Sequence, residues 1–127
     1  MRLLIADDAE IVRRAIVQVI ANCCEGVEVV GLATDYGDLL RTFESARPDV
    51  VLMDLNMPAE NPVEPAILKA HLSSACLLAM SAYFDDTSSE IARACGAKEL
   101  LDKAKLAETL QPAIERCMGP QQKAAGR

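Results

Sequence analysis

The sequence contains few of the residues that mark several common kinds of binding site. It has no tryptophan, and aromatic residues make up 3% of it. No stretch combines lysine and arginine with aromatic side chains, and the formal net charge is −6. We therefore expect no direct contact with nucleic acid, whose phosphates attract basic surfaces. No apolar run approaches the roughly 20 residues that a membrane-spanning helix requires, so we expect no membrane partner.

Histidine and cysteine are also arranged unlike those of a metal-binding or disulfide-rich protein. The single histidine, His71, has no cysteine near it in the sequence and is expected at the surface or at a helix end. The five cysteines are odd in number and contain no pair spaced as CxxC. We expect reduced thiols that pack as small hydrophobic side chains, at Cys23, Cys24, Cys76, Cys95 and Cys117.

The amino terminus does not resemble a secretion signal. Its apolar run, Leu3–Ala6, is short, and Asp7 and Asp8 follow it at once. We therefore expect a cytoplasmic protein.

No glycine-rich loop follows the apolar run Leu3–Ala6, which argues against a nucleotide or flavin carrier.

The sequence does contain a regular alternation of apolar runs and helical patterns. Its 127 residues, 51% of them hydrophobic, suffice for one domain with a core. Apolar runs predict strands at residues 3–6, 27–32, 50–53, 75–80 and 98–102. Apolar residues at helical spacing predict helices at about residues 12–20, 36–43, 65–72, 86–95 and 106–117. Five such units predict an α/β fold with a parallel sheet covered on both faces, and strand 27–32 at an exposed edge.

The carboxyl terminus is expected to be less ordered than the rest. Gly119 and Pro120 should end the last helix, because proline does not continue a helix. We therefore predict a domain at residues 1–118 and a flexible tail or linker stub at residues 119–127.

One predicted strand ends on a carboxylate. The run Val50–Met53 is apolar at every position, as in a strand buried on both faces. Asp54 follows, and Pro58 prevents the strand from continuing. Ligands bind at the carboxyl ends of the strands in open α/β sheets, which makes Asp54 a candidate site residue. Taken alone, it is better explained as a turn or cap residue, because aspartate is favoured there.

Polar residues follow three other predicted strands at the same edge. They are Asp7 and Asp8 after the first strand, Ser81 after the fourth and Lys103 after the fifth. Carboxylates this close raise one another's pKa unless a cation neutralises them, and oxygen ligands suit Mg²⁺, with Mn²⁺ as an alternative. A carboxylate beside Mg²⁺ and an ammonium group suits formation of an aspartyl phosphate. Lys103 and Ser81 would contact the transferred oxygens.

These residues, in this order, resemble the receiver domain of two-component response regulators over residues 2–118. The matching stretches are Asp7-Asp8, Asp54-Leu55-Asn56-Met57-Pro58, Ser81-Ala82, Gly96-Ala97 and Lys103. The resemblance implies a CheY-like, flavodoxin-like fold. Such a fold is a doubly wound, five-stranded parallel sheet of order 2-1-3-4-5 with five helices.

The resemblance also implies the chemistry of the site. Asp54 would take a phosphoryl group from a histidine kinase or a phosphotransfer protein in a Mg²⁺-dependent reaction. Asp8, Asp54 and the backbone carbonyl of Asn56 would bind the metal, with Asp7 acting largely through water. Such a domain is not a general enzyme, because it catalyses only its own phosphotransfer and dephosphorylation.

The signalling parts follow from the same resemblance. Lys103 would contact the phosphoryl group, and Ser81 would report its presence. Residues 86–118, from the fourth helix through the last strand and helix, would bind a downstream protein target or an output domain, and a homodimer stays open. The opening stretch is most similar to receivers that precede a helix-turn-helix domain, which suggests the receiver part of a longer transcriptional regulator.

Three positions depart from the family pattern. The family usually has an aromatic residue three positions before the lysine; here it is Leu100, an atypical switch position. Proline usually follows the lysine, often with a cis bond; here it is Ala104, and we expect a trans bond. Pro62 replaces the glycine that usually opens the third helix, which should alter that loop.

Two further residues are candidates for tuning the lifetime of the phosphate. Asn56 and Tyr83 occupy positions that, in the family, lie near the water that attacks the aspartyl phosphate. Tyr83 is equally explained as a cover for exposed apolar surface.

Two other interpretations remain open. A small Mg²⁺ phosphatase of the haloacid dehalogenase type uses similar residues, but its nucleophile lies on an early strand as DxD. Here the acid pair comes first, and the chain is short for such an enzyme. A receiver-like domain that no longer takes phosphate is opposed by the intact acids and Lys103, whereas Leu100 keeps it open.

Overall fold

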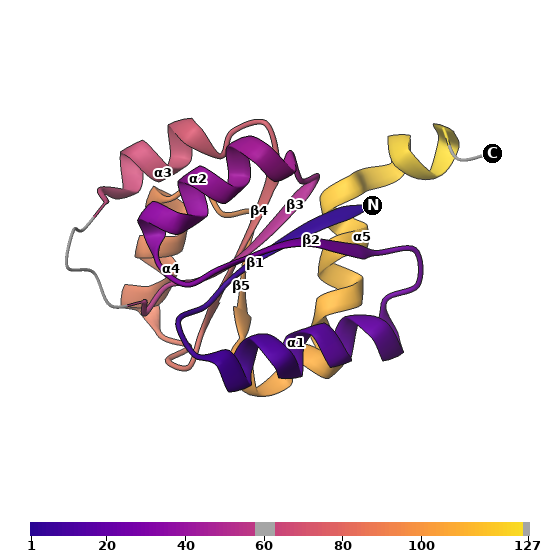
Figure 1. Cartoon of the computed structure of the whole chain (residues 1–127), viewed down its shortest axis with the longest axis horizontal. Helices are drawn as coiled ribbons and strands as arrows, with labels where there is room; N and C mark the ends of the chain where they lie inside the picture. Colours follow the sequence, from indigo (N-terminus) through magenta and orange to yellow (C-terminus); the bar gives the residue numbers. More distant parts are fainter. Residues whose placement is uncertain (58–62, 126–127) are drawn as a thin grey trace.

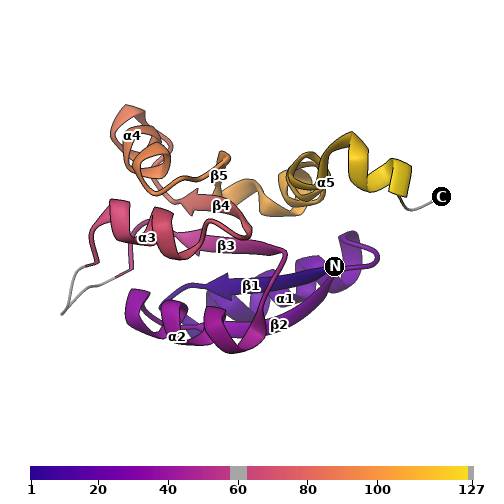
Figure 2. The same cartoon turned by 90° about the horizontal axis from the view of Figure 1, so that it is seen from above.

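A computed structural model describes residues 1–57 and 63–125, with side chains as far as Met118 (Figure 1). Five strands form one parallel sheet in the order β2-β1-β3-β4-β5 (Figure 2). The strands are β1 (Arg2–Ala6), β2 (Glu28–Ala33), β3 (Val50–Asp54), β4 (Cys76–Ser81) and β5 (Glu99–Asp102). The helices are α1 (Glu10–Cys23), α2 (Tyr36–Ala46), α3 (Pro65–His71), α4 (Asp86–Ala94), the 3₁₀ turn η1 (Lys103–Lys105) and α5 (Leu106–Ala125). The predicted fold class, strand order and helices are confirmed.

Two apolar clusters cover the two faces of the sheet, because successive strand residues point to opposite sides. Leu3 and Ile5 of β1 pack with residues of α1 and α5. Leu4 and Ala6 of the same strand pack with residues of α2 and α3. The central strand β3 is buried along its whole length, whereas β2 is largely half-buried, as expected of an edge strand. The centre of the sheet therefore holds the end of β3 in a fixed place.

Short polar residues and glycine define the helix ends near the site. Oδ1 of Asp35 accepts a hydrogen bond from the backbone N–H three residues later (2.7 Å), and Oδ1 of Asp85 does the same (2.8 Å). Both are N-caps, of α2 and α4. After α4, Gly96 adopts a φ of +85°, and a Cβ atom there would lie 2.8 Å from Cγ of Lys69. A side chain at position 96 would therefore disturb both the end of α4 and its contact with α3.

The last helix is longer than predicted, because α5 continues through Gly119 and Pro120 to Ala125. A proline inside a helix cannot donate a hydrogen bond to the carbonyl four residues before it. That carbonyl belongs to Arg116, and it accepts a hydrogen bond from Nζ of Lys98 instead (2.6 Å). The predicted helix end at Gly119 is therefore wrong, whereas the domain boundary at residue 118 stays a prediction.

The structure also corrects the prediction that all five cysteines are reduced. A disulfide joins Cys76, at the start of β4, to Cys117 on α5, and their Cα atoms are 5.9 Å apart. Sequence spacing did not indicate this pair, because 41 positions separate the two residues and the packing of α5 on the sheet brings them together. Cys23 is free and exposed, and Cys24 and Cys95 are free and buried.

Several smaller predictions have clear outcomes. His71 is exposed at the end of α3, as expected. Among the described residues there is no cis peptide bond, so the bond before Ala104 is trans. Pro62 lies outside the described residues. Within residues 1–57 and 63–125, no helix is both long and apolar enough to cross a membrane.

Candidate functional site

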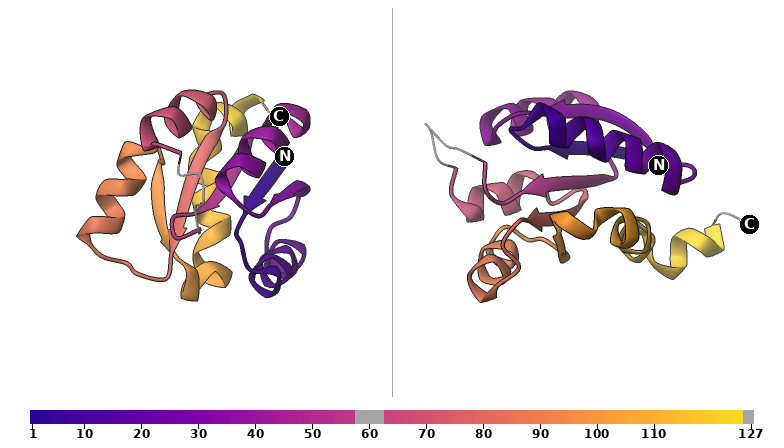
Figure 3. Two further views of the ribbon diagram at one scale, coloured as in Figure 1. Left: turned by 60° about the vertical axis from the view of Figure 1, so that its left-hand side comes forward. Right: turned by 90° about the horizontal axis from the view of Figure 1, so that it is seen from below.

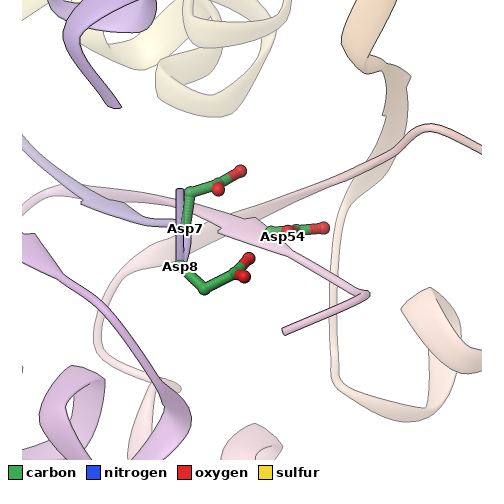
Figure 4. A group of neighbouring side chains, drawn as sticks. All are labelled: Asp7, Asp8 and Asp54. Atoms are coloured by element: carbon green, nitrogen blue, oxygen red, sulfur yellow. The ribbon is translucent and has the colours of Figure 1, made fainter. Parts of the chain in front are cut away.

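The carboxyl ends of the strands bring the three predicted acids together. One carboxylate oxygen from each of Asp7, Asp8 and Asp54 lies within 4.8 Å of the others. Figure 4 shows the three carboxylates directed to the same side of the sheet edge. Asp7 and Asp54 are buried, with 0% and 2% of their surface exposed, whereas Asp8 is exposed. The cluster is therefore open to solvent on the side of Asp8.

The backbone at the end of β1 holds Asp7 in place. The Asp7 N–H donates to the carbonyl of Ala33 in β2 (3.0 Å), and Nη1 of Arg13 donates to the Asp7 carbonyl (2.7 Å). Oδ1 of Asp7 accepts a hydrogen bond from the N–H of Ala9 (2.9 Å). Oδ2 is buried, and no donor in the described part of the chain is aligned with it for a hydrogen bond. This oxygen therefore depends on ionic contacts.

Lys103 supplies this ionic contact, whereas its predicted contact with a phosphoryl group stays a prediction. It follows β5 directly, and Oδ1 of Asp102 fixes the turn by accepting the N–H of Ala104 (2.9 Å). Nζ of Lys103 lies 2.8 Å from Oδ2 of Asp7 and 3.3 Å from Oδ2 of Asp54. Burial lowers the pKa of Lys103, but its contacts with the two carboxylates outweigh burial and raise the pKa overall. Lys103 is therefore a cation shared by two buried acids.

Asp54 is held at the end of β3 by contacts on both carboxylate oxygens. Oδ1 accepts a hydrogen bond from the N–H of Asn56 (2.9 Å), and Oδ2 accepts one from Lys103 (3.3 Å). Burial is the main reason that the pKa of Asp54 is raised, and the charge of Asp7 adds to it. The Asn56 N–H and Lys103 oppose this rise by stabilising the charged form. The charged form of the Asp54 carboxylate is therefore only partly compensated by the Asn56 N–H and Lys103.

Ser81, at the end of β4, is joined to the neighbouring loops. Its buried hydroxyl donates to Oδ1 of Asn56 (2.9 Å) and accepts the N–H of Tyr83 (3.0 Å). Oγ of Ser88, in the first turn of α4, lies 3.5 Å from Oγ of Ser81. The hydroxyl therefore connects the loop after β3 with the start of α4.

The remaining predicted residues lie around this centre in different environments. Asn56 is exposed, and so is Tyr83, with 66% of its surface accessible. Leu100 is half-buried in β5, where it is in register with Ala79 of β4. The roles that we predicted for these side chains stay predictions.

Sequence reasoning missed two residues that support the site. The hydroxyl of Tyr36 donates to the backbone carbonyl of Asp54 (3.3 Å), although its spacing indicated only an apolar helix face. Arg13, whose guanidinium donates to the Asp7 carbonyl, lies on the polar side of α1. Neither contact has a local signal, because each joins the first turns of a helix to a strand end.

The donor set fits a hard divalent cation. Three carboxylates supply the oxygens that Mg²⁺ and Mn²⁺ prefer. The buried Oδ2 of Asp7 lacks an aligned hydrogen-bond donor, and the exposed side at Asp8 leaves room for bound water. These features are suited to a cation that keeps part of its hydration shell.

The sequence matches the family model of the response regulator receiver domain over residues 3–115. The chain belongs to this family. It is therefore the receiver domain of a two-component response regulator, and its flavodoxin-like sheet agrees with that assignment.

Known proteins show how far the likeness of this receiver domain extends. It is 32% identical over 114 residues to the transcriptional regulatory protein PdtaR of Mycobacterium tuberculosis, covering 90% of this chain and 55% of PdtaR. It is 30% identical over 113 residues to the response regulator GacA of Pseudomonas viridiflava, covering 87% of this chain and 52% of GacA. The chain thus spans about half the length of these relatives. The signal receiver domain of the response regulator NarL from M. tuberculosis superposes with a TM-score of 0.80 at 25% identity, covering 94% of this chain and 96% of that one.

Proposed function

We propose that Asp54 is the phosphoryl acceptor of this receiver domain. A carboxylate oxygen of Asp54 attacks the phosphorus of a phosphohistidine on a histidine kinase or a phosphotransfer protein. The bond from phosphorus to the histidine nitrogen breaks, and its electron pair stays on the nitrogen, which takes up a proton. The observation that carries the proposal is the buried Asp54 carboxylate, placed at the sheet edge among two other acids and 3.3 Å from Nζ of Lys103.

The neighbours of Asp54 are suited to the charge that arrives with the phosphoryl group. A divalent cation, Mg²⁺ or Mn²⁺, held by Asp8, Asp54 and the backbone carbonyl of Asn56, with Asp7 acting through water, would neutralise charge on the transferred oxygens. Lys103 already contacts Asp54, and its ammonium group attracts the added negative charge. The chemistry of the domain is then limited to transfer onto and off Asp54.

We further propose that Ser81 carries the phosphorylation signal toward α4. Its hydroxyl donates to the side chain of Asn56 and accepts the N–H of Tyr83. A phosphoryl oxygen would compete with Asn56 for this hydroxyl proton. Movement of the Ser81 hydroxyl would change its contacts with Tyr83 and with Ser88 of α4, whose Oγ lies 3.5 Å away. This route does not require an aromatic residue at position 100.

The surface formed by residues 86–118 is the proposed partner surface. Exposed apolar side chains lie beside it and on it: Tyr83 (66%), Phe84 (63%) and Ile91 (41%). Apolar groups of this kind suit a protein partner, which would be a downstream target, an output domain or a second copy of the chain. Asn56 and Tyr83 stay candidates for control of the phosphate lifetime.

The first prediction tests the acceptor directly. Incubation with acetyl phosphate and Mg²⁺ should add the mass of one phosphoryl group to the protein, as measured by intact-mass spectrometry. Asp54→Asn should add none, because the amide oxygen is a poor nucleophile. The matched control is Asp49→Asn, which makes the same change at an exposed residue just before the other end of β3.

The outcome also distinguishes the alternatives. Equal phosphoryl uptake by Asp54→Asn and the wild type would contradict the proposal. A wild type that takes up no phosphoryl group would support a receiver-like domain without phosphorylation. Turnover of many small phosphate esters would instead support a phosphatase.

A further inference from the structure

We propose that Cys76 and Cys117 are a reversible redox site that fastens the end of α5 to the sheet. The structure joins their sulfur atoms in a disulfide, and the Cα separation of 5.9 Å lies within the range that disulfides require. Phosphorylation at Asp54 is a separate matter, because the two cysteines lie at the start of β4 and on α5, whereas Asp54 ends β3.

The positions of the two cysteines make them a fastening point. Cys76 is the first residue of β4, and its backbone N–H donates to the carbonyl of Asp49 (2.9 Å), so it is fixed to the sheet. Cys117 lies on α5, which continues for two further turns to Ala125. Figure 3 shows these last turns projecting beyond the sheet. The disulfide therefore joins a rigid strand to the helix just before the helix leaves the body of the domain.

Polar contacts to the start of β5 hold the same turn of α5. The guanidinium of Arg116 donates two hydrogen bonds to the carboxylate of Glu99, the first residue of β5 (2.8 and 2.7 Å). Nζ of Lys98 donates to the carbonyl of Arg116. These contacts keep Cys117 close to Cys76 when the thiols are reduced, so that oxidation needs little rearrangement.

The partial exposure of the two residues favours a reversible reaction, because thiol–disulfide exchange requires access to the sulfur atoms. Both are half-buried at the margin of the core on the α1 and α5 face of the sheet. The three other cysteines are free, and Cys24 and Cys95 are buried. In a reducing compartment, a disulfide that persists is unusual, and one that forms and breaks is typical of redox sensing.

The chemistry is thiol–disulfide exchange with a low-molecular-weight disulfide such as oxidised glutathione. The thiolate of one cysteine attacks a glutathione sulfur and releases one glutathione thiolate. The thiolate of the second cysteine then attacks the protein sulfur of the mixed disulfide and releases the second glutathione. The cysteine pair loses two electrons, glutathione disulfide gains them, and the two cysteine protons end on the two released thiols.

The test counts thiols in the full chain. The native protein is oxidised with glutathione disulfide, quenched with acid, then denatured and alkylated with iodoacetamide. Intact mass should show three alkylated cysteines, and all five after treatment with dithiothreitol. Peptide mapping should find Cys76 linked to Cys117.

Cys23→Ser is the matched control and should keep the link, whereas Cys117→Ser should lose it. Asp54→Asn should form the same link as the wild type, which separates this test from the phosphoryl one.

Hydrogen exchange tests the second part of the proposal. Amides in the last turns of α5 should exchange several-fold faster in the reduced than in the oxidised wild type. This comparison needs no variant, so it does not depend on whether Cys117→Ser folds.

The redox site would be overturned by five alkylated cysteines after oxidation, by a link between any other pair, or by a glutathione adduct left on Cys76 or Cys117. Equal exchange in the two states would overturn the fastening.

Discussion

At the scale of single residues, the two buried acids of the site share one ammonium group, that of Lys103. Nζ of Lys103 contacts Oδ2 of both Asp7 and Asp54, and the first of these oxygens has no aligned hydrogen bond from the described residues. Removing one partner of a buried ion pair leaves the other charge uncompensated, which is costly in free energy. The lysine therefore has a structural role in addition to its proposed contact with the phosphoryl group.

Lys103→Ala should lower both stability and phosphoryl uptake. We expect the free energy of unfolding to fall by about 2 kcal/mol, below the roughly 3–5 kcal/mol of a fully buried pair, because a fifth of the lysine side chain (20%) is already exposed. Urea denaturation measures the first effect, and the initial rate of phosphoryl transfer from acetyl phosphate measures the second. Lys105→Ala, at an exposed position two residues later, should change neither. An unchanged transfer rate in Lys103→Ala would contradict the proposed role.

Sequence and structure agree best at this scale. Asp7, Asp8, Asp54, Ser81 and Lys103 were predicted from their positions after apolar runs, and the structure places all five at the carboxyl ends of the parallel strands, whereas their roles stay predictions. Tyr36 was not identified, because its contact with the Asp54 carbonyl depends on how α2 is placed against β3. A local pattern describes which side of a helix is apolar, but not which strand end that side reaches.

At the scale of elements, α5 is the least expected part of the fold. Glycine and proline at positions 119 and 120 normally end a helix. Here the carbonyl that Pro120 leaves without a backbone donor is bound by Lys98, which precedes β5. The cysteine pair was missed for the same reason, because both contacts depend on α5 packing against the sheet. Strand order likewise came from the family resemblance, since apolar periodicity does not specify which strands are neighbours.

The pair of Glu99 and Arg116 should make this end of α5 sensitive to acid. The hydrogen bonds from Arg116 are the main reason that the pKa of Glu99 lies below its usual value of 4.5. A carboxylate with a lowered pKa adds stability above its unfolded pKa, and this contribution is lost as the pH falls through the folded pKa. Glu99→Gln should therefore be less stable than the wild type at neutral pH, by up to about 1 kcal/mol because the pair is partly exposed.

The difference between Glu99→Gln and the wild type should disappear as the pH is lowered below 4.5. Urea denaturation at several pH values measures it. Glu90→Gln, at an exposed position of α4, is the control and should show no such dependence. A difference that stayed constant with pH would show that the ion pair is not its source.

Reduction of the cysteine link should destabilise the whole fold through α5. A cross-link that closes a loop of this length typically adds about 2–4 kcal/mol. The melting temperature should therefore fall on the order of 10 °C when dithiothreitol is added. Scanning calorimetry of the oxidised and reduced wild type measures the change, and Cys23→Ser should show the same difference. A melting temperature that does not respond to reduction would contradict a stabilising cross-link.

At the scale of the whole molecule, the domain has two separately held regions. The acids and Lys103 lie at the carboxyl ends of the strands. Cys76 lies at the amino end of β4, where its disulfide with Cys117 fastens α5. The rigid strands β3 and β4 join the two regions. Ser81 ends β4 at the acidic site, and Cys76 begins the same strand. Phosphorylation of Asp54, through the proposed contact with Ser81, and oxidation of Cys76 would therefore act at opposite ends of β4.

Locating the phosphoryl group chemically shows whether Asp54 carries it. An aspartyl phosphate is an acyl phosphate, which borohydride reduces to homoserine, whereas a free carboxylate is not reduced. After treatment with acetyl phosphate, Mg²⁺ and borohydride, peptide sequencing by mass spectrometry should find homoserine at position 54 and unchanged aspartate at positions 7 and 8. Homoserine at position 7 or 8 with aspartate intact at position 54 would show that Asp54 is not the acceptor.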